Sequence, residues 1–338
     1  MGDNLAVMAS LTRELESSAE CHSVLLEWKQ LHDLLQELEV RFSLVGDRVQ
    51  GRPLNEIQSY IPEIQRGWQV CGDHIITKLI PFAQEIKHIG QPYRVEDGQL
   101  SGEEWIVKIV QAQRSIDKDL EEIGLGPLQE HVGHLDSLIT KHLFQADTRL
   151  QATRTVLKDS VTRLTTIMEE DSRIPAPLAE DLVEFVEAQK RLLEWMGLHG
   201  LFQRLRTNYL AIYSIASRKQ PTELDSSTIE LIRIAWQVFK NTIFQELIAF
   251  ARTISYIGEA YREEGGSPRG EEWVVRLVQL QEAIDQALKD LSLRPLHEFI
   301  ISLGSLIRRY FNEADDKLQK TAIELDRLSI QLRGRVGG

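Results

Sequence analysis

Glu85 and His88 have the spacing that di-metal carboxylate bundles use, a glutamate and a histidine three residues apart on one helix. Such a centre needs the same pair on a second helix together with two further glutamates, and no second inward-facing pair is evident. The stretch EHVGHLDSLITKH places His131, His134 and His142 near one stripe of an expected helix, where imidazoles could converge on a metal ion.

Other catalytic patterns are missing from the sequence. No glycine-rich loop follows a strand-like segment, and no serine or cysteine lies in a recognisable nucleophile elbow. The two cysteines, Cys21 and Cys71, do not form a Cys-x-x-Cys pair, and a long chain with so few cysteines is not a disulfide scaffold. We therefore expect reduced thiols, no catalytic residues and no cofactor.

The sequence repeats itself at an offset of about 168 residues. GEEWIVKIVQAQ at Gly102 returns as GEEWVVRLVQLQ at Gly270, and the alignment runs without a gap across residues 79–151. Further upstream, LLEWKQLHDLLQ at Leu25 returns as LLEWMGLHGLFQ at Leu192, with an offset of 167. Self-similarity of this length indicates two copies of a whole domain rather than a short solenoid repeat.

The second copy replaces the metal-ligand candidates of the first. Thr253 and Tyr256 stand where the first copy has its Glu-x-x-His pair, and Phe299, Ser302 and Tyr310 stand where it has the three histidines. Aromatic replacement at two of the three histidine positions indicates partly buried packing sites. We therefore interpret these histidines as core or boundary residues and expect no metal site.

The tryptophans also fall into matched pairs, which indicates repeated core positions rather than a ligand cage. The pairs are Trp28 with Trp195, Trp68 with Trp236, and Trp105 with Trp273.

Apolar residues at alternating spacings of three and four predict a long final helix in each copy. The pattern runs from Leu128 to Met168 in the first copy and from Leu296 to Leu332 in the second. At ~1.5 Å per residue, each of these helices is about 60 Å long. An earlier pattern, from Trp28 onward, predicts another long helix that ends at the QGRPLNE segment.

Helix boundaries are expected from the turn residues. A helix that runs to about Ile89 is followed by a Gly- and Pro-rich loop, and Ser101 with Glu104 forms a capping box for the next helix. Ser267 and Pro268 take that place in the second copy. We expect four helices in each copy and no sustained strand.

Loop lengths indicate how the helices are arranged. Short loops at 51–53, 124–127 and 219–222 imply antiparallel neighbours in elongated bundles. The third helix of each copy, at roughly 21 residues, is about half as long as its neighbours at ~1.5 Å of rise per residue. It would leave an apolar groove to be filled by the other copy, a second chain or a partner helix.

The predicted fold is therefore all-α, with two tandem homologous, elongated antiparallel four-helix bundles that arose by internal duplication. Copy one is expected to span 1–171 and copy two 179–338. The linker, 172–178, contains two prolines that a helix could not cross unbroken.

The net charge of −12 argues against a general nucleic-acid binder, which needs a surplus of basic residues on one face. Residues 1–170 hold 17 Lys and Arg against 27 Asp and Glu, whereas residues 171–338 hold 22 against 24. Basic clusters in the second half could dock an acidic face of a partner. The candidate interaction residues are Arg204, Arg206, Arg308 and Arg309.

These features favour a non-enzymatic scaffold or adaptor that presents helical surfaces to a protein partner or to a second copy of itself, as a homo-oligomer. One alternative is a membrane-acting helical protein, either curvature-binding or pore-forming, although no apolar stretch approaches the ~20 residues that span a bilayer. Another is a metal-dependent bundle enzyme. The first residues lack a signal-peptide pattern, so we expect a cytoplasmic protein. We interpret the terminal Gly337 and Gly338 as a frayed end or the start of a linker rather than a conjugation tail.

Overall fold

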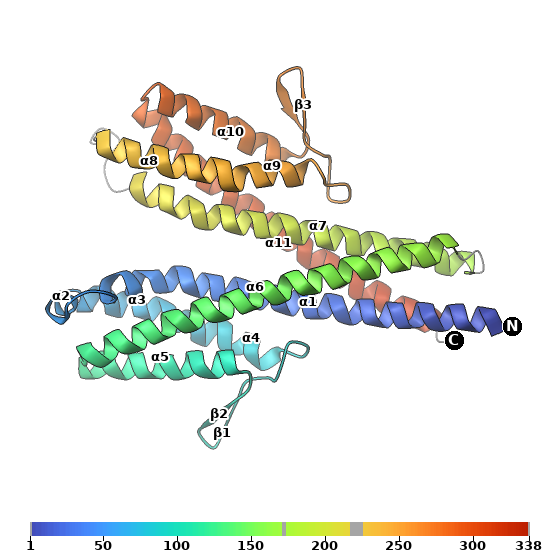
Figure 1. The fold of residues 1–338 in the computed structure, drawn as a ribbon, viewed down its shortest axis with the longest axis horizontal. Helices are drawn as coiled ribbons and strands as arrows, with labels where there is room; N and C mark the ends of the chain where they lie inside the picture. Colours follow the sequence, from blue (N-terminus) through green and yellow to red (C-terminus); the bar gives the residue numbers. More distant parts are fainter. Residues whose placement is uncertain (1, 171–173, 217–225, 337–338) are drawn as a thin grey trace. The chain divides into compact units, whose positions relative to one another are not determined.

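The computed structural model describes residues 2–170, 174–216 and 226–336 (Figure 1). Almost all of them lie in long helices, and the strands form two short hairpins, which confirms the all-α prediction at the level of fold class. The chain divides into two compact units. The N-terminal unit is Glu16–Ser160, and the C-terminal unit is Val161–Gly338 together with Met1–Leu15.

The N-terminal unit contains most of two long helices, with shorter elements between them. In chain order its elements are α1 (Gly2–Val49), α2 (Leu54–Ser59), α3 (Ile61–His74), the π-helix η1 (Ile75–Leu79), α4 (Ile80–Glu85), β1 (Arg94–Glu96), β2 (Gln99–Ser101), α5 (Glu104–Glu122) and α6 (Leu125–Glu170).

The C-terminal unit has a similar order of elements. They are α7 (Ala176–Ala216), α8 (Ser226–Phe239), the π-helix η3 (Lys240–Phe244), α9 (Gln245–Ala251), β3 (Arg262–Glu264), β4 (Ser267–Arg269), α10 (Glu272–Lys289) and α11 (Leu293–Val336). Helix α7 lies against both α11 and α8, and α10 lies against α11. The expected loop at 219–222 lies outside the described residues.

The helix expected to run to about Ile89 differs in detail from the observed segment. It is interrupted at Tyr60, passes through the π-helix η1 and ends at Glu85. Pro81, in the first turn of α4 after η1, has no N–H to donate within the helix. The C-terminal unit also contains a π-helix, η3, three residues before the position that aligns with η1, and it has Ala249 in place of Pro81, so a proline is not required for a π turn.

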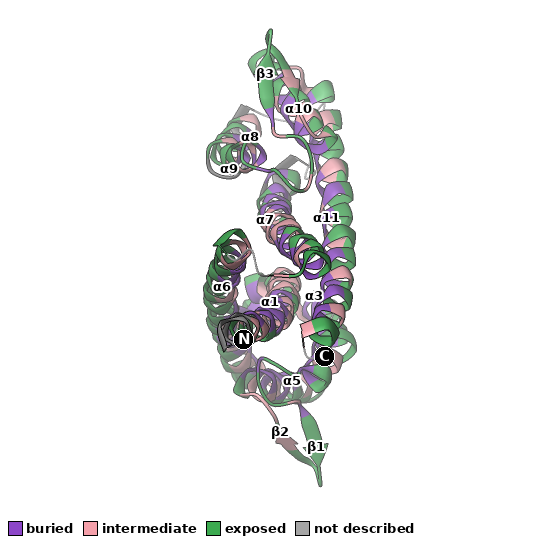
Figure 2. Cartoon of the chain, turned by 90° about the vertical axis from the view of Figure 1, so that its right-hand side faces the viewer, coloured by how far each residue is buried: buried purple, intermediate pink, exposed green. Residues whose placement is uncertain are grey.

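Each unit has one main apolar core, and the predicted seams line it as far as Ala146 on α6 and Ala314 on α11. Along α11 every seam position from Leu296 to Leu332 is buried, and the buried residues follow one side of the helix (Figure 2). Four of the six tryptophans are buried, whereas Trp28 and Trp195 are only half-buried. The core interpretation therefore holds for two of the three pairs and only partly for the third.

The predicted capping boxes are wrong, because both segments form β-hairpins. Ser101 lies in β2, and α5 begins after the N-cap residue Glu103, whose side chain makes no capping bond. Ser267 and Pro268 lie in β4, and Glu271 is the N-cap of α10. The strands pair antiparallel around two-residue turns that contain positive φ angles.

One carboxylate anchors the chain where the second helical segment of each unit ends. Glu27 on α1 accepts hydrogen bonds from the backbone N–H groups of Lys87, His88 and Ile89, with N···O distances of 3.0, 2.9 and 3.1 Å. His88 therefore lies in this loop and not on a helix with Glu85, so the Glu-x-x-His pair does not form a helical metal-ligand pair.

The C-terminal unit repeats the anchor. Glu194 on α7 accepts from the N–H groups of Ser255, Tyr256 and Ile257 at 2.9, 2.9 and 3.1 Å. The next residue, Gly258, has a φ of 156°, and a Cβ there would overlap the side chain of Glu271. The repeated LLEW segment thus supplies both a carboxylate for the loop and a ring that packs on the core.

A second carboxylate acts at the start of the third helix. Glu103 accepts the N–H of Gln91 at 2.8 Å, and Glu271 accepts the N–H of Glu259 at 2.9 Å. The repeated GEEW segment therefore begins a helix and fastens the preceding loop to it.

A third shared contact joins the second and third helical segments. The indole Nε1 of Trp236 donates to Asp285 at 2.8 Å, and the same carboxylate accepts from Lys240 and Gln281 at 2.6 and 2.8 Å. In the N-terminal unit, Trp68 donates to Asp117 at 2.6 Å. Burial raises the pKa of Asp285, but the bonds from Lys240, Trp236 and Gln281 outweigh it, so the pKa lies below its ordinary value.

Replacing Glu194 by Ala should lower the free energy of unfolding by about 1–3 kcal/mol, because three N–H groups lose their acceptor. Hydrogen exchange at Ser255, Tyr256 and Ile257 should accelerate. The matched control is Glu184→Ala on the same helix, which removes an exposed pair with Arg327 and should cost less than about 1 kcal/mol. Equal urea midpoints for the two variants would contradict the anchoring role.

Asp285→Asn should reduce stability at neutral pH and not in strong acid. Because the folded-state pKa is depressed, the contribution of the carboxylate is present above the ordinary Asp pKa of about 4 and is lost as the pH falls through the folded-state value. Thermal unfolding of wild type and variant should therefore converge below that pH. Asp316→Asn, which removes an exposed ion pair with Lys320, serves as control and should show little difference at any pH.

Candidate interaction surfaces

The four candidate arginines lie on two neighbouring helices of the C-terminal unit. Arg204 and Arg206 are on α7, Arg308 and Arg309 are on α11, and all four are exposed. The guanidinium of Arg206 lies over the ring of Phe311 on α11, 5.4 Å from its centroid. These positions come to one level of the unit because α7 and α11 pack against each other.

The structure separates the four arginines into two groups. Arg204 binds Glu246 on α9 at 2.7 Å, and Arg309 is 4.0 Å from Glu272 on α10. No carboxylate among the described residues lies within ion-pair distance of Arg206 or Arg308. Arg206 and Arg308 are therefore the two arginines of this set that could form an ion pair with a partner protein.

Arg308 also lies near a buried phenol. Burial raises the pKa of Tyr209 to about 12, and the nearby positive charge of Arg308 opposes that rise. The Tyr209 ring lies so close to Gly304 on α11 that a Cβ at that glycine would overlap it. The contact between Tyr209 and Gly304 therefore determines which part of α7 lies beside Arg308.

An apolar groove of about 620 Å³ lies between α10 and α11. Helix α10 is 18 residues long and α11 is 44, so much of α11 has no α10 beside it. Ile301, 45 % exposed, is its most accessible large apolar side chain. The lining residues are Arg276, Gln279, Leu280 and Ala283 of α10 with Ile301, Ser302, Ser305 and Leu306 of α11.

The rim of this groove is basic. Arg276 and Arg309 share one carboxylate, that of Glu272, at 2.7 and 4.0 Å. Arg308 follows Ile301 by seven residues and therefore lies on the same face of α11. Three guanidinium groups thus accompany two carboxylates, those of Glu272 and Glu313, at this end of the groove.

The apolar lining of the groove is specific to the second copy, whereas the cluster around Glu272 recurs in the first copy as Lys108 and Lys141 around Glu104. At the aligned positions, the first copy has Ala112 for Leu280, Ser115 for Ala283 and Gly133 for Ile301. Thr140 stands at the position of Arg308. The apolar lining and the unpaired arginine are therefore not needed for the fold that the two units have in common.

A second copy-specific surface lies on α8. Leu231, Ile234 and Val238 are 54, 55 and 57 % exposed and follow one another at helical spacing, opposite the buried side of the helix. The aligned positions in α3 include Glu63 and Arg66. This surface is apolar without a charged residue that would indicate the character of a partner.

The three candidate histidines do not converge. His131 is 2.6 Å from Asp119, His142 is buried with its Nδ1 2.9 Å from Gln145, and His134 is exposed. Among the described residues, no group of three His, Cys, Asp or Glu side chains could hold a metal ion.

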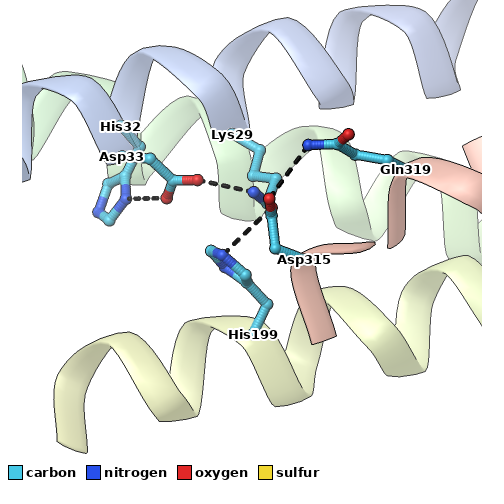
Figure 3. A network of polar contacts seen from close by, with 6 residues as sticks. All are labelled: Lys29, His32, Asp33, His199, Asp315 and Gln319. Atoms are coloured by element: carbon cyan, nitrogen blue, oxygen red, sulfur yellow. Dashed lines mark hydrogen bonds and ion pairs between the residues drawn. The ribbon is translucent and has the colours of Figure 1, made fainter. Parts of the chain in front are cut away.

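Histidines that align between the copies take different partners. His32 on α1 lies 3.7 Å from Asp33 of its own helix, which in turn binds Lys29 at 2.7 Å (Figure 3). His199 on α7 is 3.5 Å from Asp315 on α11, within the C-terminal unit (Figure 3). Each of these contacts uses groups of its own unit.

Both cysteines are buried and neither forms a disulfide. Burial raises the pKa of the Cys71 thiol to about 12, so the thiolate needed for nucleophilic attack does not form near neutral pH. Cys71 is therefore a core residue.

No protein family, curated protein or solved structure matches the chain. Within residues 2–170, 174–216 and 226–336, no helix has an apolar stretch that could cross a bilayer.

Proposed function

We propose that the chain is a non-enzymatic interaction protein, a scaffold or adaptor, that binds an acidic amphipathic helix of a partner protein in the groove between α10 and α11. The observation that carries this proposal is the groove itself. It combines an apolar lining that is particular to the C-terminal unit with a cluster of two arginines around Glu272, which Lys108, Lys141 and Glu104 repeat in the N-terminal unit.

The proposal includes the origin of the fold, two tandem homologous four-helix bundles produced by duplication, with copies at 1–171 and 179–338 joined by 172–178. Contacts at matched positions support it. The Glu27 and Glu194 anchors, the two Trp–Asp bonds and the two hairpins recur at offsets of 167 or 168 residues.

Duplication gives a way to separate folding residues from binding residues. Residues that both copies share make the anchors and the core, so folding accounts for them. An exposed apolar side chain such as Ile301, present in one copy and absent from the other, costs solubility without serving the common fold. Binding a partner accounts for its presence.

The chemistry of the groove defines its occupant. An amphipathic helix presents apolar anchors at i, i+3 or i+4 and i+7, which suits a groove between two helices. Acidic residues beside those anchors would face Arg276, Arg308 and Arg309. Of the four candidate arginines, Arg309 lies near Glu272, the partner of the lining residue Arg276, and Arg308 lies two turns after the lining residue Ile301 on α11. Arg204 and Arg206 would add long-range attraction from α7.

We propose no catalytic residue and no cofactor, and a cytoplasmic location for the chain, which contains two buried thiols. A second copy of this chain is the other occupant that the groove could accept, and the oligomeric state in solution distinguishes it from a separate partner.

The test uses two designed helical peptides of about 18 residues, each with Leu at i, i+3 and i+7. One carries Glu on both flanks and the other carries Lys at the same positions. Fluorescence anisotropy with the full chain should show saturable binding of the Glu peptide that weakens as salt increases, and much weaker binding of the Lys peptide. Equal affinities would contradict the basic rim.

Ile301→Ser should weaken the Glu peptide about tenfold, equivalent to about 1.4 kcal/mol, because it removes the exposed anchor of the groove. Ile323→Ser is the matched control, since Ile323 is on the same helix, 70 % exposed and outside the groove. Both variants should retain the helix content of wild type by circular dichroism. Loss of binding in the control alone would place the site elsewhere on α11.

Arg308→Thr, which introduces the residue of the first copy, should weaken binding a few-fold at low salt and little at high salt. The combined charge reversal of Arg308 and Arg309 should do so more strongly. If both variants bind the Glu peptide as tightly as wild type, the two arginines take no part in recognition.

A further inference from the structure

A pocket of about 420 Å³ lies within the N-terminal unit, between α1, the start of α5 and the middle of α6. Its apolar lining includes Trp28, Leu31, Trp105 and Ala146, and the exposed ring of Phe144 stands at its edge. Pockets that take small ligands have volumes of about 300–1,000 Å³ and mostly apolar walls with a few polar groups. This pocket has both properties.

His142 supplies a polar group at the wall. His142 is only 5 % exposed, and its Nδ1 lies 2.9 Å from Oε1 of Gln145. An amide oxygen only accepts, so Nδ1 carries the proton and Nε2 is left as an acceptor. Nε2 is buried and has no hydrogen-bond partner among the described residues. Burial also lowers the pKa of His142, which keeps the ring neutral.

Among the charged residues that line this pocket, one cation has no carboxylate partner in the described part of the chain. Glu104 binds Lys108 and lies 3.7 Å from Lys141, and Glu103 accepts the N–H of Gln91. Arg149 is exposed, and no carboxylate of the described residues lies within ion-pair distance of it. Both carboxylates of this rim therefore already have hydrogen-bond or ion-pair partners, and Arg149 is the cation to which an anionic ligand could bind.

The other copy indicates that the pocket is not required for folding. Phe202 stands at the position of Leu35, and Tyr310 at the position of His142. In the C-terminal unit the Phe202 ring packs 5.8 Å from the ring of Trp273 and 6.0 Å from that of Tyr310. Larger rings thus occupy this level of the core where the first copy has Leu35 and His142.

We propose that this pocket binds a small aromatic carboxylate that carries a hydrogen-bond donor on its ring. The ring lies between Trp28, Trp105 and Phe144, the donor gives His142 Nε2 the partner it lacks, and the carboxylate binds Arg149. The site is independent of the groove between α10 and α11, because it lies in the other unit and selects a different ligand.

Isothermal titration calorimetry on the full chain tests the proposal with three probes of nearly equal size. Indole-3-acetate has the ring, the N–H donor and the carboxylate. Its 1-methyl derivative lacks the donor, and tryptamine replaces the carboxylate with a cation. Indole-3-acetate should bind with one site per chain, and each of the other two should bind at least tenfold more weakly.

Variants then assign the binding to this pocket. His142→Tyr takes the residue of the second copy at that position, which the related core accommodates, and it should weaken indole-3-acetate at least tenfold. Arg149→Gln should weaken it several-fold and reduce the preference over tryptamine. The matched control, His134→Ser, changes an exposed histidine of the same helix to the residue of the second copy and should leave binding unchanged.

Two results would overturn the proposal. One is the absence of saturable binding of indole-3-acetate at millimolar concentration by a chain whose helix content is intact. The other is equal binding of indole-3-acetate by wild type and His142→Tyr. Binding of the Glu peptide to the C-terminal unit is measured separately, so failure at one site leaves the other result standing.

Discussion

A single glutamate side chain from the first helix of each unit holds the loop that ends the second helical segment. Glu27 and Glu194 each accept three successive backbone N–H groups, of which the third, that of Ile89 or Ile257, is partly buried. The loop then returns to the core, where the N–H of Tyr93 or Tyr261 donates to a carbonyl of the preceding helix. The hairpin and the start of the third helix follow from that fixed point.

The same constraint accounts for the segments that repeat most closely. The Glu-Trp pair in LLEW places a carboxylate on the loop and a ring on the core, and the GEEW segment does the same from the opposite side of the loop. Once both are in place, exposed positions and a few core positions are free to change. The first copy has Leu35 and His142 where the second has Phe202 and Tyr310. The second has larger apolar side chains at 280 and 301. One scaffold thus supports a pocket in one unit and a groove in the other.

Periodicity alone was sufficient to predict the long helices, because an apolar stripe over many turns has one low-energy arrangement in water. The sequence does contain a turn signal for each hairpin, but the capping-box interpretation assigned the same segments to helix starts. Asp97-Gly98 and Gly265-Gly266 are the dipeptides that two-residue turns with positive φ prefer. The role of Glu103 as N-cap and loop anchor could not be predicted from local spacing, since its partner is twelve residues away across a turn.

The candidate site shows the same limit. The sequence placed Arg204, Arg206, Arg308 and Arg309 in one set because they are basic and differ between the copies. Only the packing of α7 and α11 against α9 and α10 shows which of them meet a carboxylate. The π-helices could not be predicted from the sequence either. A π turn adds one residue to a helical turn and leaves the apolar pattern on either side in place.

The central claim is that a common scaffold presents different binding surfaces in its two units. Hydrogen–deuterium exchange of the full chain, with and without the Glu peptide at saturation, tests it most directly. The account predicts new protection at residues 276–283 and 301–309 and none at the aligned residues 108–115 and 133–141. Equal protection of both sets, or protection confined to other segments, would contradict it.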